Sequence, residues 1–317
     1  MKAFRGIAAA VISLNLLLAC SDQGARSMPA QQMLTIESDI VYAEGQTSRG
    51  SKPLLMDVYQ VDEACERLKP LVIIIHGGAF VRGSKTRSGW DERARDAARR
   101  GYVAAAINYR LIPDQPVISN EFVAVRDDLF EAKADLPSNT HSLKIYAGGI
   151  AAAIEDTVTA LRFLEGNSPQ DRCIDMSRIG LWGGSAGAIA AMHVAYGLDD
   201  YDIGFPKPDV VIDYWGMMFI GGMMRPSDAA LFILHGSADD RVAAKGAFDL
   251  KRQADAVGVG ASLYIVDGAA HGYADISLNS QHQAVNGVTL LALTLNFLDA
   301  HLKDDAAGPV YETVTIK

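Results

Sequence analysis

A serine between two glycines is the feature of this sequence that most directly suggests chemistry. Residues 179–187 read Ile-Gly-Leu-Trp-Gly-Gly-Ser-Ala-Gly, which places Ser185 in a Gly-x-Ser-x-Gly pattern with Gly183 and Gly187. An apolar run leads into the pattern, and an alanine-rich helical segment, 188–196, follows it. A strand, a sharp turn and a helix in this order hold a serine hydroxyl at the carboxyl end of a sheet, where it can act as a nucleophile.

A nucleophilic serine needs a general base, and His271 is the candidate. It lies in a glycine-flanked loop after the apolar run 262–266, so it is free to swing toward the serine. Among the seven histidines, it combines a position at a strand end with the chain order Ser…Asp…His. His76 remains an alternative base. His193 lies two turns along the helix after the serine and is expected to be packed or solvent-exposed.

The elements that must position these residues follow from the alternation of apolar runs with helical patterns. The alternating segments 33–42 and 54–59 predict an antiparallel entry hairpin. Further strands are predicted at 71–75, 102–107, 179–183, 210–214, 230–234 and 262–266, and helices at 87–100, 151–164, 188–196, 243–256 and 282–301. This order predicts an α/β fold, with a mostly parallel sheet and helices on both faces. The tail 309–317 is left open between an edge strand and disorder.

One irregular segment, 113–149, interrupts this alternation. It contains three prolines and the pair Gly148-Gly149, and it leaves the carboxyl end of a predicted central strand. Ligands of open α/β sheets bind at that end of the strands. The segment is therefore predicted to be a small cap-like insertion with a short helix around 120–134, and a decorated surface loop is the alternative.

Four segments at strand ends together resemble the α/β-hydrolase fold. They are 73–80, 179–187, 231–242 and 262–273. Within that fold they are similar to the branch that holds hormone-sensitive-lipase-like proteins and bacterial carboxylesterases or feruloyl esterases. The resemblance spans about 54–302, and it implies a single α/β-hydrolase domain over 33–317.

The resemblance also implies the remaining site residues. The segment His76-Gly77-Gly78-Ala79 is similar to the His-Gly-Gly-Gly segment of lipases and esterases, with alanine in the last glycine position. Because the oxyanion hole uses backbone N–H groups, Gly78, Ala79 and Ala186 are the implied donors. The segment 235–242 reads His-Gly-x-x-Asp-x-x-Val and resembles the acid-bearing turn. It places the acid at Asp239, with Asp240 as the neighbouring alternative and His235 as a structural residue.

The activity implied by the resemblance is hydrolysis of small or medium neutral carboxylic esters through an acyl-enzyme intermediate. No cofactor is implied, and no cysteine or histidine cluster has the spacing of a zinc site. A polymer-related esterase is the alternative within the same class, with feruloyl, acetyl-xylan or polyester-oligomer substrates. An inactive hydrolase fold used as a binding module is the alternative from another class. The presence of Ser185, Asp239 and His271 weighs against it.

An apolar segment after the strand 210–214 is the candidate substrate pocket. It is rich in methionine, which adapts to irregular ligands, and its glycines leave it flexible. The expected lining residues are Trp215, Met217, Met218 and Phe219. Core packing under a short helix is the alternative for this segment.

The amino terminus is predicted to be an address and not part of the fold. Residues 1–19 have a positive start and an apolar stretch too short to span a bilayer, as in a signal peptide. The sequence Leu-Leu-Ala-Cys ending at Cys20 resembles the bacterial lipobox, which implies a lipidated Cys20 and a flexible tether over 20–32. An ordinary signal peptide is the alternative. The expected location is the bacterial cell envelope, periplasm-facing or at the outer membrane, or otherwise secretion.

The acidic composition of the chain limits the partners that it can bind. The formal net charge is −9 and no basic stripe appears, so nucleic acid is an unexpected partner and an anionic polymer would be repelled. The partners expected are a small ester and a membrane, whereas the oligomeric state is left open.

Cys65 and Cys173 each lie six residues before a predicted parallel strand, 71–75 and 179–183. They are predicted to form a disulfide in an oxidising compartment, with two buried thiols as the alternative.

Overall fold

A nine-stranded sheet forms the centre of the computed structural model, which describes residues 33–61, 65–132, 143–167 and 169–317. Its strands are β1 (Leu34–Thr47), β2 (Gly50–Val61), β3 (Lys69–Ile75), β4 (Val103–Ile107), β5 (Ile174–Gly184), β6 (Val210–Tyr214), β7 (Ala230–Gly236), β8 (Ala261–Val266) and β9 (Thr313–Ile316). The spatial order is β1-β2-β4-β3-β5-β6-β7-β8-β9. The pairs β1–β2 and β2–β4 are antiparallel and the pairs from β4 to β9 are parallel, which confirms the predicted α/β fold.

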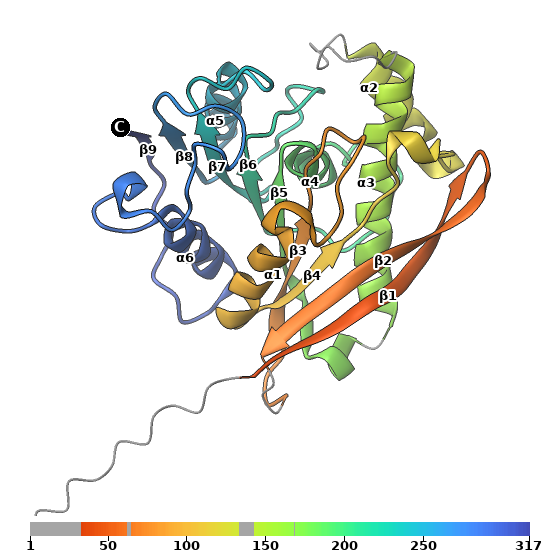
Figure 1. Ribbon diagram of the computed structural model, residues 1–317, viewed down its shortest axis with the longest axis horizontal. Helices are drawn as coiled ribbons and strands as arrows, with labels where there is room; N and C mark the ends of the chain where they lie inside the picture. The colour runs from red at the N-terminus through yellow and green to blue at the C-terminus, as the bar shows by residue number, and fades with distance from the viewer. Residues whose placement is uncertain (1–32, 62–64, 133–142, 168) are drawn as a thin grey trace, which may run out of the picture. The chain divides into compact units, whose positions relative to one another are not determined.

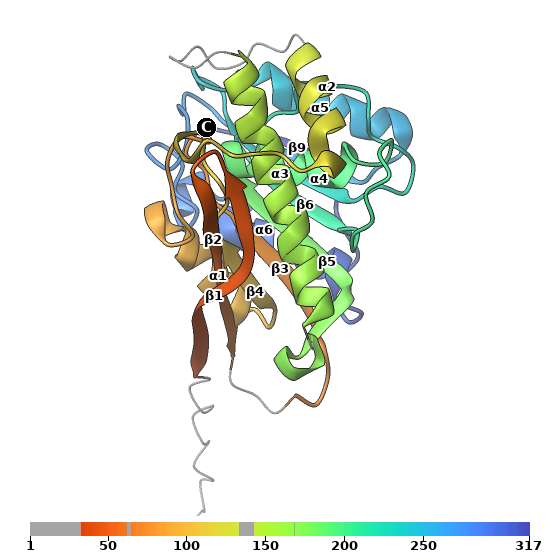
Figure 2. The ribbon, with the colours of Figure 1, turned by 90° about the vertical axis from the view of Figure 1, so that its right-hand side faces the viewer.

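Helices cover both faces of this sheet, within the compact unit Met33–Lys317. They are α1 (Trp90–Arg99), α2 (Val123–Glu131), α3 (Leu143–Gly166), α4 (Ala186–Tyr196), α5 (Lys245–Val257) and α6 (Leu290–Leu302). Side chains of α2, α3, α4 and α5 share one apolar core, and those of α1 and α6 share the other (Figures 1 and 2). Because β3 is covered from both sides, its apolar run is buried throughout, as parallel strands of this kind are.

Two predicted helices have different starts in the structure. Helix α3 begins at Leu143 and includes the pair Gly148-Gly149, although these glycines lie in the segment predicted to be irregular. A Cβ atom at Gly149 would lie 2.4 Å from Ile112 Cγ1. This glycine therefore lets the Ile112 side chain pack closely against α3, and it does not end the helix. Helix α6 begins at Leu290 and not near residue 282, and Thr289 caps it by accepting a hydrogen bond from Ala292 N–H.

The segment predicted as cap-like, 113–149, is partly helical, as the short helix predicted around 120–134 requires. It contains helix α2, which packs against α3, and the first turns of α3 itself. Residues 133–142 lie outside the described residues. Tyr146, on the first turn of α3, reaches the cavity described below.

The structure describes the carboxyl-terminal end of the chain but not residues 1–32. At the carboxyl end, β9 adds a parallel edge strand beside β8, which resolves the alternative left open for the tail. Residues 1–32, with the predicted signal peptide, Cys20 and the tether, lie outside the described residues. Among the helices that are described, none is both long and apolar enough to cross a membrane.

Cys65 and Cys173 form the disulfide that the sequence predicts. Their Cα atoms are 5.6 Å apart, and 108 residues separate them along the chain. Cys65 precedes β3 and Cys173 immediately precedes β5, and these two strands are parallel neighbours in the sheet. The bond therefore joins the amino-terminal ends of the two strands.

Candidate active site

Ser185 occupies a sharp turn between β5 and α4. Its backbone has φ 52° and ψ −118°, a strained conformation for a residue with a side chain. The turn is tight because the start of α4 nearly touches both β5 and the end of β3. A Cβ atom at Gly187 would lie 2.0 Å from Ile75 O, and one at Gly183 would lie 2.3 Å from Gly187 C. Only glycine fits at these two positions, as the Gly-x-Ser-x-Gly pattern predicts.

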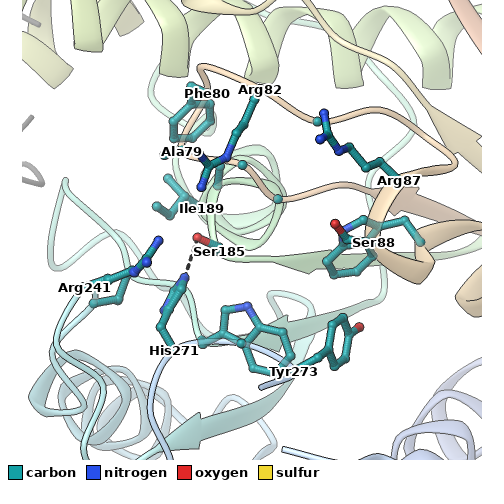
Figure 3. A pocket seen from close by; sticks show the side chains of 18 of the residues that line it. Ala79, Phe80, Arg82, Arg87, Ser88, Ser185, Ile189, Arg241, His271 and Tyr273 are labelled. Atoms are coloured by element: carbon teal, nitrogen blue, oxygen red, sulfur yellow. Dashed lines mark hydrogen bonds between the residues drawn. The ribbon is translucent and has the colours of Figure 1, made fainter. Parts of the chain in front are cut away.

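The three residues predicted to react lie within hydrogen-bonding distance of one another. Ser185 Oγ is 2.9 Å from His271 Nε2. On the other side of the ring, His271 Nδ1 is 2.7 Å from Asp239 Oδ2 (Figure 3 shows the Ser185–His271 contact). A serine, a histidine and an aspartate in this chain of contacts are arranged for proton transfer from the hydroxyl to the ring.

Asp239 is held as an anion by donors on all sides. Its Oδ1 accepts hydrogen bonds from the N–H groups of Arg241 and Val242, each at 2.9 Å. His235 Nε2 lies 3.3 Å from Oδ2 and also donates to Val242 O. Burial alone would raise the pKa of Asp239, but the hydrogen bonds from His235, His271 and the backbone outweigh it and hold the pKa below its usual range. The neighbouring Asp240 is exposed and makes no such contact with the histidine.

The predicted oxyanion donors line the same cavity as Ser185 and His271. Ala186 is the first residue of α4, so its N–H has no acceptor one turn earlier in the helix. Gly78 and Ala79 have φ values of 128° and 54°, in a turn where the N–H groups of Val81 and Arg82 donate to Gly78 O. Among the described residues, no acceptor is recorded for the N–H groups of Gly78 and Ala79.

The substrate pocket differs from the prediction. A cavity of about 680 Å³ opens at Ser185, and of the four predicted lining residues only Trp215 borders it. Met217 and Met218 pack against the core instead, and Phe219 is buried beside His193. The sequence places this segment after β6 correctly but does not give the directions of its side chains, and core packing, the alternative for the segment, applies to three of the four.

Several cavity residues were missed by the sequence analysis. They include Phe80, Arg82, Arg87, Trp90, Tyr146, Ile189, Arg241 and Tyr273. Most of them lie within a few residues of a recognised motif: Arg82 follows the oxyanion segment, Arg241 lies inside the acid-bearing turn, and Tyr273 follows His271 by two positions. Proximity to the motifs was the signal that could have found them.

The alternative base, His76, has a structural position. Its ring is buried and stacks on Tyr109 at a centroid distance of 4.3 Å, and its Nδ1 is 2.8 Å from Gly77 O. Burial lowers its pKa to about 4. The ring supports the loop that carries Gly78 and Ala79, and the hydrogen bond to Ser185 belongs to His271. Within the described ranges, no three His, Cys, Asp or Glu side chains gather closely enough to hold a metal ion.

His193 makes the stability of the fold sensitive to acid. Its Nδ1–H donates to Ile189 O and its Nε2 accepts from Phe219 N–H. Protonation of Nε2 would turn this acceptor into a donor, and two N–H groups would then point at each other. Burial lowers its pKa from 6.5 to about 4. Because the folded-state pKa is depressed, the stabilisation is complete above the unfolded value and is lost as the pH falls from 6.5 toward 4.

We expect this histidine alone to lower the free energy of unfolding by about 2 kcal/mol between about pH 7 and pH 5. Urea unfolding at the two pH values measures the change. A His193→Gln variant, which cannot be protonated, should lose correspondingly less stability over the same interval. An equal loss in the variant and the unchanged protein would refute this role for His193.

Comparison with known proteins places the geometry in context. The family model described as BD-FAE matches residues 56–145, which contain Gly78 and Ala79 but end before Ser185. No curated protein sequence matches the chain.

Several solved structures are similar to the chain in fold. The native esterase of Thermogutta terrifontis aligns with a TM-score of 0.61 at 18% identity, covering 86% of this chain and 95% of the esterase. A truncated carbohydrate esterase from gut microbiota aligns with a TM-score of 0.60 at 18% identity, covering 85% of this chain and 97% of the other. A bifunctional GH43-CE protein of Bacteroides eggerthii aligns with a TM-score of 0.60 at 18% identity, over 84% of this chain and 35% of its own. The chain therefore has the fold of these bacterial esterases.

Proposed function

We propose that this protein is a serine hydrolase that cleaves carboxylic esters through an acyl-enzyme intermediate. The observation that carries the proposal is the continuous contact from Ser185 Oγ through His271 to the buried carboxylate of Asp239, at the mouth of a cavity. The fold shared with bacterial esterases and the partial match to the BD-FAE family model support it.

The mechanism follows from the positions of these groups. His271 Nε2 accepts the proton as Ser185 Oγ attacks the ester carbonyl, and Asp239 holds Nδ1–H so that the ring keeps the required tautomer. The N–H groups of Gly78, Ala79 and Ala186 stabilise the negative oxygen of the tetrahedral intermediate. His271 then returns the proton to the leaving alcohol. Water attacks the acyl-enzyme by the same route, and the carboxylic acid is released.

A polymer-related substrate is the second candidate. Two of the similar structures are described as a carbohydrate esterase and a bifunctional GH43-CE protein, and the BD-FAE match covers the oxyanion loop. These likenesses favour an acyl group carried on a saccharide. We further propose that Cys20, outside the described residues, is lipidated and anchors the enzyme in the bacterial envelope. Its lipobox-like sequence supports this, and mass spectrometry of the membrane-extracted protein would test it.

The experiment that tests the enzyme proposal is hydrolysis of p-nitrophenyl esters from acetate to laurate, with fluorophosphonate labelling alongside. Activity together with labelling at Ser185 supports the proposal. A folded protein with no activity and no labelling would instead favour the inactive binding module. Acetylated or feruloylated oligosaccharides, measured in the same way, separate the two substrate classes.

The corrected pocket gives a prediction about acyl-chain length. Ile189 lines the cavity from α4, whereas Met218 packs against the core and does not line the cavity. Ile189→Ala enlarges the cavity and is expected to shift kcat/KM toward longer acyl chains by about tenfold, since each methylene in an apolar pocket has an effect of this order. Met218→Ala is the matched control and should leave the order of preference unchanged. The reverse pattern would return the pocket to the segment after β6.

A further inference from the structure

Three arginines surround the cavity without a partner of their own. Arg82 and Arg87 follow the oxyanion loop, Arg241 lies in the acid-bearing turn, and all three line the cavity with exposed side chains. Within the described part of the chain, no hydrogen bond or ion pair is recorded for their guanidinium groups. Figure 3 shows Arg82 and Arg241 extending toward Ser185 from two different loops.

This arrangement differs from that of arginine elsewhere in the molecule. Most other described arginines pair with a carboxylate, as Arg100 does with Asp299 and Arg162 with Glu121. The exceptions outside the cavity are Arg49, which donates to a backbone carbonyl, and Arg67. An acidic protein with a net charge of −9 thus leaves three guanidinium groups unpaired around its candidate nucleophile.

The balance of charge inside the cavity is therefore opposite to that of the whole chain. Among the described residues that line the cavity, Asp240 is the one acidic residue against three arginines, and Asp239 is buried with its carboxylate at His271. A cleft lined mainly by one sign of charge concentrates ligands of the other sign. The lining of this cavity therefore carries more positive than negative side chains.

Three aromatic residues line the same cavity as these arginines. The rings of Trp215 and Tyr273 are in edge contact at 4.8 Å, and Trp90 lies 5.9 Å from Tyr273. These rings line the same cavity and offer apolar contact to a flat or cyclic group. The site thus combines an apolar surface for a ring with forked cationic donors.

We propose that the esters hydrolysed at this site carry a carboxylate on their acyl or alcohol part, and that Arg82 and Arg241 bind it. The guanidinium fork matches the two oxygens of a carboxylate, and such charge-assisted hydrogen bonds are among the strongest in proteins. This inference rests on the proposed function, because it names the substrate class of the same site. It replaces the expectation of small or medium neutral esters, which the family resemblance implied.

Two pairs of esters, matched in size and differing in charge, test the inference. On the acyl side, mono-p-nitrophenyl adipate is compared with p-nitrophenyl hexanoate. On the alcohol side, para-acetoxybenzoate is compared with its methyl ester. For each pair, the ratio of kcat/KM for the anionic ester to that for the neutral ester is measured in the unchanged protein and in variants. Comparing ratios between proteins cancels the intrinsic reactivity of each ester.

In at least one pair, Arg82→Gln and Arg241→Gln are each expected to lower the ratio about tenfold, the effect of removing one charge-assisted hydrogen bond. Arg82→Lys keeps the charge and should recover part of it. Added salt should lower the ratio in the unchanged protein. Arg67→Gln removes an exposed, unpaired arginine outside the cavity and should leave the ratio as it was. Unchanged ratios in both cavity variants, for both pairs, would overturn the inference.

A binding measurement separates this inference from the proposed function. If the unchanged protein hydrolyses the neutral esters but the ratios do not respond to the arginines, the function stands and the inference fails. If none of the four esters is hydrolysed, the proposed function fails, and calorimetric titration of Ser185→Ala with para-acetoxybenzoate decides the inference. Binding that weakens about tenfold when Arg82→Gln or Arg241→Gln is added supports it. Absent or unaltered binding overturns it.

Discussion

Replacing Ser185 with alanine is expected to lower kcat for ester hydrolysis about a million-fold, to the residual rate that the oxyanion donors and substrate binding provide. The reason is geometric, because Ser185 Oγ is the hydroxyl that lies 2.9 Å from a histidine nitrogen at the cavity. His271→Ala should have a comparable effect, since the serine is a weak nucleophile without its base. The double variant should be no slower than either single variant, because the two residues act as one unit.

A second serine in the same cavity provides the control. Ser88 lines the cavity and is exposed, but no described histidine is recorded within hydrogen-bonding distance of it. Ser88→Ala should therefore keep kcat within about threefold, a change equivalent to less than about 1 kcal/mol. Steady-state rates for p-nitrophenyl butyrate in the four variants and the unchanged protein test this. Additive losses in the double variant, or a larger loss in Ser88→Ala than in Ser185→Ala, would show that Ser185 and His271 do not work as a pair.

The reacting residues could be predicted from the sequence because each is tied to the end of a strand. Gly183 is required by the local contact between β5 and α4, and Gly187 by the close approach of α4 to Ile75 O at the end of β3. Asp239 and His271 follow β7 and β8, two neighbouring parallel strands, so their loops meet at one edge of the sheet. When short motifs follow neighbouring strands of one sheet, their positions in the sequence predict most of the geometry of the site.

The pocket could not be predicted in the same way, because it depends on where side chains point. Met217 and Met218 lie two and three positions after Trp215, yet only Trp215 reaches the cavity, while the methionines pack against the core. The arginines show the same limit for charge. The formal net charge of the sequence is negative. The electrostatic field at Ser185 depends instead on Arg82 and Arg241, which lie 159 positions apart in the sequence and line the same cavity from two loops.

The disulfide carries the second large effect. Replacing both Cys65 and Cys173 with alanine is expected to lower the free energy of unfolding by up to about 4–5 kcal/mol. The bond closes a loop with a sequence separation of 108, and restricting so long a loop removes many conformations from the unfolded chain. Urea unfolding with linear extrapolation measures the loss, and a reductant should destabilise the unchanged protein but not the double variant.

Activity is expected to separate from stability in this variant. The cysteines lie at the amino-terminal ends of β3 and β5, whereas Ser185 follows the carboxyl end of β5. Removing the bond alters the unfolded state and the amino-terminal ends of β3 and β5, which lie opposite the active-site end of the sheet. The kcat/KM of the folded double variant should therefore stay close to that of the unchanged protein. A loss of activity below the unfolding transition would mean that the bond also sets the position of β5. A loss of stability under about 1 kcal/mol would mean that the unfolded chain is already compact around this loop, because the entropy model then overstates the conformations removed.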